Sequence, residues 1–293
     1  MANLKEIRQR IASVQTTRQV TSAMKLVSAA KLRKAQDAVI KLRPFANKLA
    51  EILSNLTETL NESGECAFTK GHGDGTSLLV VAVNSNRGLC GAFNSNINKA
   101  MNQVVAEHRA QGFTNVDVMA IGKNAFEFAK RSKLNVSEFN DLYSALDFEH
   151  AVPIIDQIMD DFTNGKYDKV VLVYNFFKNA STQSVTVEQL LPIAVSEAEP
   201  KQNSGTIANY IFEPSEESLV EKILPMSLRM QFYKAVLNSF AAEHAARMTA
   251  MHKATDNATE LLRELNLQYN KARQAAITNE ITEIVGGADA LKE

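Results

Sequence analysis

The sequence predicts an α/β protein with a long antiparallel two-helix coiled coil and a Rossmann-like α/β domain inserted between the two helices. The N- and C-terminal parts of the 293-residue chain repeat apolar residues at alternating steps of three and four, a pattern typical of coiled coils. The middle of the chain alternates short apolar runs with amphipathic segments, as α/β sheets do. Only 12 Gly and 6 Pro favour long uninterrupted helices. The predicted parts are an N-terminal helix at 1–60, a central α/β domain at 61–213 and a C-terminal helix at 214–293.

The N-terminal helix keeps one register from Leu4 to Leu60, although its middle, Arg18 to Ser28, is polar. Pro44 removes a backbone donor and clashes with the preceding turn, so we expect a kink or a break near Arg43. The sequence Glu62-Ser63-Gly64 is expected to end the helix.

The C-terminal segment from Pro214 to about Val285 reads as one helix, and its apolar positions form a sustained seam at Leu219, Ile223, Met226, Met230, Tyr233, Leu237 and Phe240. Such a seam needs a partner helix, which the N-terminal segment provides. Antiparallel pairing places Leu60 near Leu219, so residue numbers across the pair add to about 275 to 280.

This register brings two polar stretches to the same level, Arg18–Ser28 and roughly Arg247–Asn257. A buried unpaired charge would cost several kcal/mol, so we interpret this level as facing outward to other proteins. The alternative is a solvated section of coiled coil.

The same register leaves the C-terminal helix unpaired beyond about residue 272. Roughly twelve to fourteen residues then project as a single helix about 20 Å long. Its apolar residues are Ile277, Ile281, Ile284 and Val285. A lone apolar helix end is unstable in water, which predicts that other protein surrounds it.

The inserted domain is expected to contain buried strands at Ser77–Asn84 and Lys169–Asn175. Further strands are expected at Val116–Ile121, Asn135–Phe139, Ser184–Leu191 and Asn209–Phe212. Helices are expected at Ala92–Gln111, Lys123–Ser132 and Leu146–Thr163, with a polar loop at Ser196–Gly205. Strands that alternate with helices predict a mostly parallel sheet.

Charge is distributed unevenly, although the formal net charge is only -1. Residues 1–43 carry ten Lys and Arg against Glu6 and Asp37, a local net charge of +8, which suits an acidic partner surface. The longest wholly apolar run, Leu78–Val83, is too short to cross a bilayer. Cys66 and Cys90 form no disulfide framework, which favours a reducing compartment.

The turn Asn86-Arg87-Gly88-Leu89-Cys90-Gly91 lies where α/β folds bind phosphate, but it lacks a dinucleotide or Walker signature. Its glycines are explained by a tight turn. Cys90 beside Arg87 has no histidine at a useful spacing, which favours a buried inert thiol. The loop Gly71–Gly75 offers too few metal ligands. We therefore predict a non-catalytic chain without cofactor or metal.

Three sequence motifs occur along the chain in this order: Ile7–Val14 with Thr21–Lys31, Asn86–Asn94 (NRGLCGAFN), and Ala246–Asn257 with Tyr269–Gly287. Together they resemble the gamma subunits of F-type rotary ATP synthases. The resemblance covers the full chain. It implies a central-stalk rotor that couples proton flow through the membrane ring to conformational cycling of the catalytic beta subunits.

The resemblance also implies the partners: three alpha and three beta subunits around the coiled coil, and the epsilon subunit and membrane c-ring at the α/β domain. It implies an apolar sleeve around the isoleucine end and acidic beta loops facing the basic helix. Positions that match the family's contacts with the catalytic subunits are Met24, Arg273 and Gln274, supported by Thr278 and Glu280, with Lys25 at a position that varies between acid and base. No nucleic acid and no membrane insertion are implied.

The expected location is peripheral, on the cytoplasmic face of a bacterial cell membrane. The chain lacks the inserted cysteine pair of chloroplast relatives, and no transit peptide is evident.

Two other classes of function compete with this one. The first is a Rossmann-like nucleotide-dependent enzyme with helical oligomerisation arms, which would bind a nucleotide saturably. The second is a nucleic-acid-binding coiled coil that uses residues 1–43, although Phe45 is the first aromatic residue in the chain.

Overall fold

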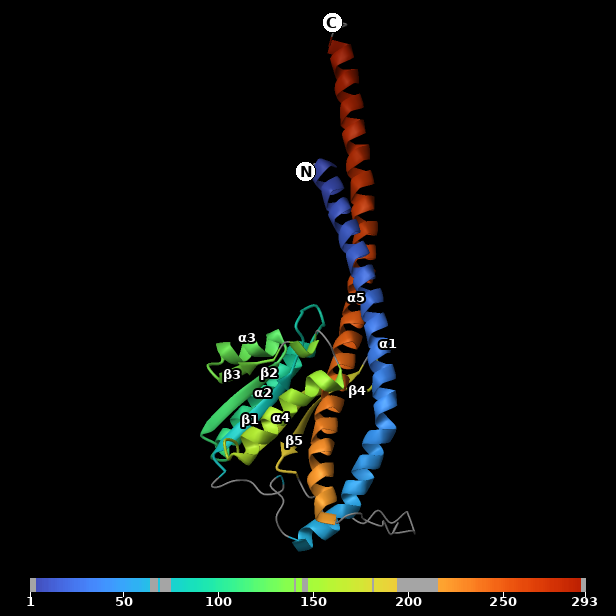
Figure 1. Ribbon diagram of the computed structural model, residues 1–293. Helices are drawn as coiled ribbons and strands as arrows, with labels where there is room; N and C mark the ends of the chain where they lie inside the picture. Colours follow the sequence, from blue (N-terminus) through green and yellow to red (C-terminus); the bar gives the residue numbers. More distant parts are fainter. Residues whose placement is uncertain are drawn as a thin grey trace. The chain divides into compact units, whose positions relative to one another are not determined.

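A computed structural model describes residues 4–63, 68, 75–139, 141–143, 147–180, 182–193 and 216–290 (Figure 1). The chain divides into two compact units. One comprises Met1–Ala29 with Arg247–Glu293, and the other comprises Ala30–Ala246. The predicted strand Asn209–Phe212, the loop Ser196–Gly205, Cys66 and residues 71–74 lie outside the described residues.

Two long helices carry the ends of the chain, as predicted. Helix α1 spans Leu4–Ser63 and helix α5 spans Glu216–Ala290, 75 residues in all. Pro44 lies inside α1 and does not end it, so a break near Arg43 is wrong. Helix α1 is described as far as Ser63, inside the expected end Glu62-Ser63-Gly64, and Gly64 lies outside the described residues.

The central sheet has five strands in the order β3-β2-β1-β4-β5. Its strands are β1 (Ser77–Val83), β2 (Asn115–Ile121), β3 (Asn135–Glu138), β4 (Lys169–Phe177) and β5 (Gln183–Leu191). Strands β1 to β4 pair in parallel and β5 pairs antiparallel with β4. The mostly parallel α/β sheet predicted from the sequence is confirmed.

Successive residues of the central strands point to opposite faces of the sheet, which gives two apolar cores. Leu78, Val80 and Ala82 pack with helices α2 (Phe93–Ala110) and α3 (Lys123–Arg131). Leu79, Val81 and Val83 pack with helix α4 (Phe148–Thr163) and with α5. Because both faces are covered, β1 is apolar at every position after Ser77.

The short connection from β2 to α3 depends on Gly122, which has a φ of 105°. A Cβ atom at this position would lie 2.2 Å from the carbonyl oxygen of Asn84. Glycine is therefore required on two grounds, left-handed backbone conformation and close approach of the neighbouring loop. The carboxyl end of β1 and the start of α3 are thereby held together.

Candidate functional site

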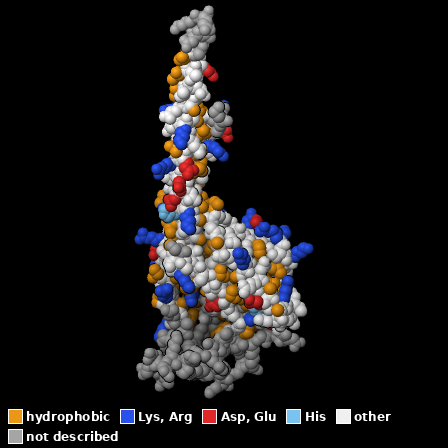
Figure 2. All heavy atoms as spheres, turned by 180° about the vertical axis from the view of Figure 1, so that it is seen from behind, with side chains coloured by type: hydrophobic (Ala, Val, Ile, Leu, Met, Phe, Trp, Pro, Cys, Tyr) orange, Lys and Arg blue, Asp and Glu red, His pale blue; other side chains and the backbone are white. Residues whose placement is uncertain are grey.

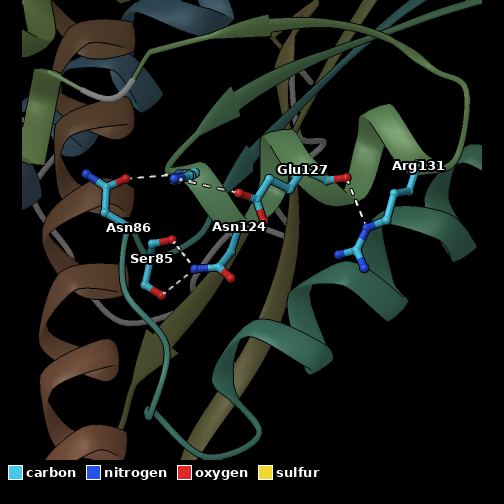
Figure 3. Close-up of polar contacts among 6 residues, drawn as sticks. Ser85, Asn86, Asn124, Glu127 and Arg131 are labelled. Atoms are coloured by element: carbon cyan, nitrogen blue, oxygen red, sulfur yellow. Dashed lines mark hydrogen bonds and ion pairs between the residues drawn. The ribbon is translucent and has the colours of Figure 1, made fainter.

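The turn after β1 is organised by a polar network around the buried Ser85 (Figure 3). The amide of Asn124 donates to the backbone oxygen of Ser85 at 2.7 Å, and the backbone nitrogen of Lys123 donates to the side chain of Asn86 at 2.9 Å. The Ser85 hydroxyl lies 2.7 Å from the backbone oxygen of Arg87. These bonds fix a turn in which Leu89 takes a φ of 63° and is 65% exposed.

The carboxyl end of β1, where an α/β enzyme would hold a phosphate, is occupied by the chain itself. The hydroxyl of Ser239, on α5, donates to the backbone oxygen of Val83 at 3.2 Å. The hydroxyl of Tyr143, in the short helix η1 (Asp141–Tyr143), donates to the backbone oxygen of Asn84. Both side chains take up the space above the strand end. This packing argues against the nucleotide-dependent enzyme.

The thiol of Cys90 is 1% exposed and packs in the core under α2, which matches the expected buried thiol. Among the residues that the structure describes, no group of three or more His, Cys, Asp and Glu side chains is placed to hold a metal ion. Within the same residues, no helix is long and apolar enough to cross a membrane.

The helical pair has the predicted antiparallel register. The hydroxyls of Thr21 and Thr255 lie 2.9 Å apart, and the guanidinium of Arg8 donates to the hydroxyl of Tyr269 at 2.7 Å. The residue numbers of these two pairs add to 276 and 277, inside the expected interval of 275 to 280. The spacing of apolar residues at alternating intervals of three and four was therefore enough to predict which residues of the two helices face each other, although they are more than 230 positions apart in the sequence.

The interpretation that the polar level faces outward is wrong. Thr21, Ser28 and Arg247 are only 9%, 2% and 7% exposed. Small hydroxyls tolerate burial because they bond to each other and to their own helix: those of Thr255 and Thr21 also lie 2.8 and 3.0 Å from the backbone oxygens four and three residues earlier. The polar level is thus a hydrogen-bonded seam.

Apolar side chains, not the polar seam, face outward on this part of α1. Val20, Leu26 and Val27 are 53%, 68% and 58% exposed. They stand beside Met24 and Lys25, which are half-buried. These residues were not predicted from the sequence, because they lie outside the positions of the helix-helix seam. Apolar residues outside those positions could have indicated an outward-facing apolar surface. We call Val20, Leu26 and Val27 the α1 apolar patch.

Helix α5 continues past Leu4, the first described residue of α1, and we call Arg273–Ala290 its end section (Figure 1). Arg8 pairs with Tyr269, so Leu4, the first described residue of α1, lies near the level of Arg273. At 1.5 Å per residue the end section extends about 27 Å. Measured against the described part of α1, the predicted overhang is confirmed, although it is longer than the expected twelve to fourteen residues.

The end section exposes an apolar stripe at helical spacing. Ile277, Ile281, Ile284 and Val285 are 47%, 56%, 71% and 54% exposed. Figure 2 shows hydrophobic side chains on the surface of this part of the helix. Among the predicted polar contact residues, Arg273, Gln274, Thr278 and Glu280 are all exposed.

The polar residues at the base of the end section include one internal bond. The hydroxyl of Thr278 donates to the backbone oxygen of Gln274 at 2.9 Å. Thr278 is thus already bonded to its own helix, which fits a supporting role better than a direct contact. Helix geometry alone brings these residues together on α5. The register places Met24 and Lys25 on α1 opposite about residue 252, roughly 30 Å along α5 from Arg273, so the structure does not bring them into the same site.

Comparison with known proteins gives full-length matches. A family model described as ATP synthase matches residues 3–291. The ATP synthase gamma chain of Flavobacterium johnsoniae is 52% identical over 291 residues, which is 99% of each chain. The chain belongs to the ATP synthase gamma chain family.

Solved structures agree with the gamma chain fold. A central stalk and c-ring structure of the Tetrahymena thermophila mitochondrial ATP synthase matches 80% of this chain and 99% of that chain, with 27% identity and a TM-score of 0.57. A chain from an assembly of the Euglena gracilis mitochondrial ATP synthase, 21% identical, matches 98% and 94% with a TM-score of 0.67. The second likeness supports the gamma chain fold alone.

Proposed function

We propose that this chain is the central-stalk rotor subunit of an ATP synthase. It couples proton flow through the membrane ring to conformational cycling of the catalytic beta subunits, and it is not itself catalytic. Its partners are three alpha and three beta subunits, the epsilon subunit and the c-ring. It is peripheral, at the cytoplasmic face of a bacterial membrane, and reaches the bilayer only through the ring.

The observation that carries this proposal is the exposed isoleucine stripe of the end section. Burying one isoleucine side chain contributes roughly 1.5 to 3 kcal/mol, so Ile277, Ile281, Ile284 and Val285 forgo several kcal/mol while they face water. A surrounding apolar sleeve recovers this free energy. A cylinder of alpha and beta subunits provides a sleeve that still allows the helix to turn.

The helical pair also has the asymmetry that a rotor requires. Three beta subunits of identical sequence hold different conformations only if something asymmetric stands between them. The pair presents the α1 apolar patch on one part of its surface and basic side chains such as Arg8 and Arg18 on others. As the pair turns, each beta subunit meets a different face, and the difference in contact free energy shifts its conformational equilibrium.

We assign the main polar contact with the beta subunits, which we call the polar catch, to Arg273 and Gln274 on α5. Met24 and Lys25 on α1 are assigned to a separate contact at the level of about residue 252. Arg273 and Gln274 are exposed and adjacent, so both are available to carboxylates and carbonyls of a surrounding subunit. Thr278 and Glu280 lie about one and two turns further on, respectively, and support the same region. An arginine suits this role because its planar guanidinium forms paired hydrogen bonds with a carboxylate.

The experiment is the double substitution Arg273→Ala with Gln274→Ala in the assembled ATP synthase. Hydrogen bonds to charged groups contribute about 1.5 to 3 kcal/mol each, so we expect ATP hydrolysis and ATP synthesis to fall by about tenfold or more. Asn270→Ala with Lys271→Ala is the matched control, because both residues are exposed on the preceding turn of α5. Unchanged hydrolysis and coupling in the first variant would refute the catch.

Assembly is tested separately by copurification with the alpha, beta and epsilon subunits. We expect an ATPase-active complex, whereas the isolated chain should hydrolyse no ATP. An isolated chain that turns over nucleotide, or that does not join the complex, would contradict the proposed function.

A further inference from the structure

Helix α5 belongs to the core of the α/β domain as much as to the helical pair. We call its part from Leu224 to Ala246 the anchor section. Leu228, Phe232 and Val236 are 1%, 0% and 0% exposed and pack in the core on the α4 face of the sheet. Further along, Ala242 packs in the core on the α2 face. The anchor section therefore joins both faces of the sheet.

Among the α1 residues of this unit whose side chains the structure describes, none makes a comparable contribution. The buried apolar residues of α1 there are Leu32, Ala35 and Leu49. Among the described residues, none of α1 belongs to either of the two cores of the domain. Within the described residues, the apolar contacts that join the two cores of the domain to the long helices are thus made by α5.

A first polar tie links the anchor section to α4. The Nε atom of Arg229 lies 2.7 Å from the Oδ1 atom of Asp156, and both side chains are about one third exposed, at 35% each. This is a charge-assisted hydrogen bond with a short, defined geometry.

A second polar tie links the anchor section to the antiparallel edge of the sheet. The amide of Gln231 donates to the Oε1 atom of Glu188, on β5, at 2.6 Å. The hydroxyl of Tyr174, on β4, donates to the other oxygen of the same carboxylate at 3.0 Å. Burial of Tyr174, and then the nearby Glu188 charge, raise the pKa of the phenol, which keeps it protonated as a donor.

The two ties hold opposite sides of one helix. Residues 229 and 231 are two positions apart, which corresponds to about 200° around an α-helix. Apolar packing resists separation but is non-directional, whereas hydrogen bonds on opposite sides resist rotation of the helix about its own axis. The anchor section is consequently braced against twisting.

We propose that rotational force passes between the α/β domain and the helical pair through the anchor section of α5, and that Arg229–Asp156 and Gln231–Glu188–Tyr174 are the positioning contacts that hold it. This inference rests on the proposed rotor function. Helix α5 is continuous from the anchor section to the end section. Force applied to the domain thus reaches the catch residues along a single helix.

The test uses the assembled ATP synthase in membrane vesicles, with two readouts: the rate of ATP hydrolysis and the membrane potential that hydrolysis generates, followed with a potential-sensitive dye. For Arg229→Gln, we expect hydrolysis within about twofold of the parent and a potential reduced at least about threefold, on the scale of measured pair couplings. The charge exchange Arg229→Asp with Asp156→Arg should restore the potential. A general folding defect caused by the loss of Arg229 would not be repaired by the exchanged pair with a selective recovery of the membrane potential.

The matched control is Lys123→Gln with Glu127→Gln, which removes an exposed 3.8 Å ion pair on α3 of the same domain. It should leave both readouts unchanged. If the Arg229→Gln complex fails to assemble, Tyr174→Phe removes only the hydroxyl that donates to Glu188, and the same partial loss of potential is expected. Normal potential per ATP hydrolysed in assembled variants overturns the inference.

The proposed rotor function and this inference fail in distinguishable ways. If the parent complex generates no potential from ATP, the rotor function itself is refuted. If the parent and control complexes do so and the tie variants do so equally, only the route through the anchor section is refuted.

Discussion

Phe232 and Leu228, in the anchor section of α5, are 0% and 1% exposed, whereas Ile281 and Ile284, in the end section of the same helix, are 56% and 71% exposed. Secondary structure is identical in the two sections, and both are rich in apolar side chains. In the anchor section the chain's own sheet and α4 cover these side chains. In the end section the described part of this chain leaves them exposed. The contrast separates apolar residues that stabilise this chain's own fold from apolar residues that are available for contact with another protein.

Between these two sections, α5 pairs with α1 through the hydrogen-bonded seam. Thr255 and Thr21 meet there at 2.9 Å, and Arg8 meets Tyr269 at 2.7 Å near the start of α1. The hydrogen bonds of the seam fix which residues of the two helices face each other, more than they bury apolar surface. Three sections of one helix therefore have three kinds of neighbour: a domain core, a single partner helix and solvent.

The largest expected effect separates the anchor section from the end section. Phe232→Ala should lower the free energy of unfolding of the isolated chain by about 3 to 5 kcal/mol, because it leaves a cavity in a closed core. Ile284→Ala should change it by no more than about 0.5 kcal/mol, because that side chain is already exposed. Urea unfolding followed by circular dichroism measures both. Equal losses for the two variants would remove the distinction.

An intermediate effect is expected in the seam. Thr21→Val or Thr255→Val alone should each cost about 1 kcal/mol, because one hydroxyl loses its cross-helix partner while buried. The double variant should cost less than the sum of the two, since no unpaired hydroxyl remains. Hydrogen exchange in residues 4–29 and 247–272 reports this locally. Simple additivity would mean that the two hydroxyls are not coupled.

The smallest effect concerns the exposed pair at the start of α1. The hydrogen bond from Arg8, followed by its positive charge, lowers the pKa of Tyr269 below its ordinary value, because both favour the phenolate. Arg8→Gln should therefore raise the pKa of Tyr269, seen as a shift of its titration to higher pH by nuclear magnetic resonance. Arg10→Gln, also exposed on α1, is the control. An unchanged titration of Tyr269 would show that the pair does not persist in solution.

Most elements of the fold could be predicted because each has a local period. The run at Leu78–Val83 predicted β1, and the three-and-four spacing predicted both long helices and their register. Pro44 shows the limit of local rules: proline disfavours a helix interior, yet α1 continues through it. A 60-residue helix has many other hydrogen bonds and contacts that outweigh one lost donor.

The candidate site was predictable in part. Ile277 and Ile281 were identified because the register showed that α1 is too short to cover them. The α1 apolar patch was missed, because Leu26 and Val27 stand in a stretch that was read by its polar seam positions. Burial of Thr21 was misread for a related reason: residue type suggested exposure, but pairing with Thr255 satisfies the hydroxyl inside the seam.

The sequence by itself determined the helix and strand periods, the antiparallel register of the pair and the overhang of α5, because each follows from spacing along the chain. Only the tertiary structure decided which parts of α5 are covered. The anchor section and the end section carry similar apolar side chains, and nothing in their spacing assigns one to the sheet and the other to solvent. That assignment depends on contacts such as Arg229 with Asp156 and Gln231 with Glu188, which join residues 73 and 43 positions apart. Asp156 and Glu188 reach their positions beside α5 only when the sheet and α4 have formed. The contacts then fix the anchor section of α5 to the α/β domain.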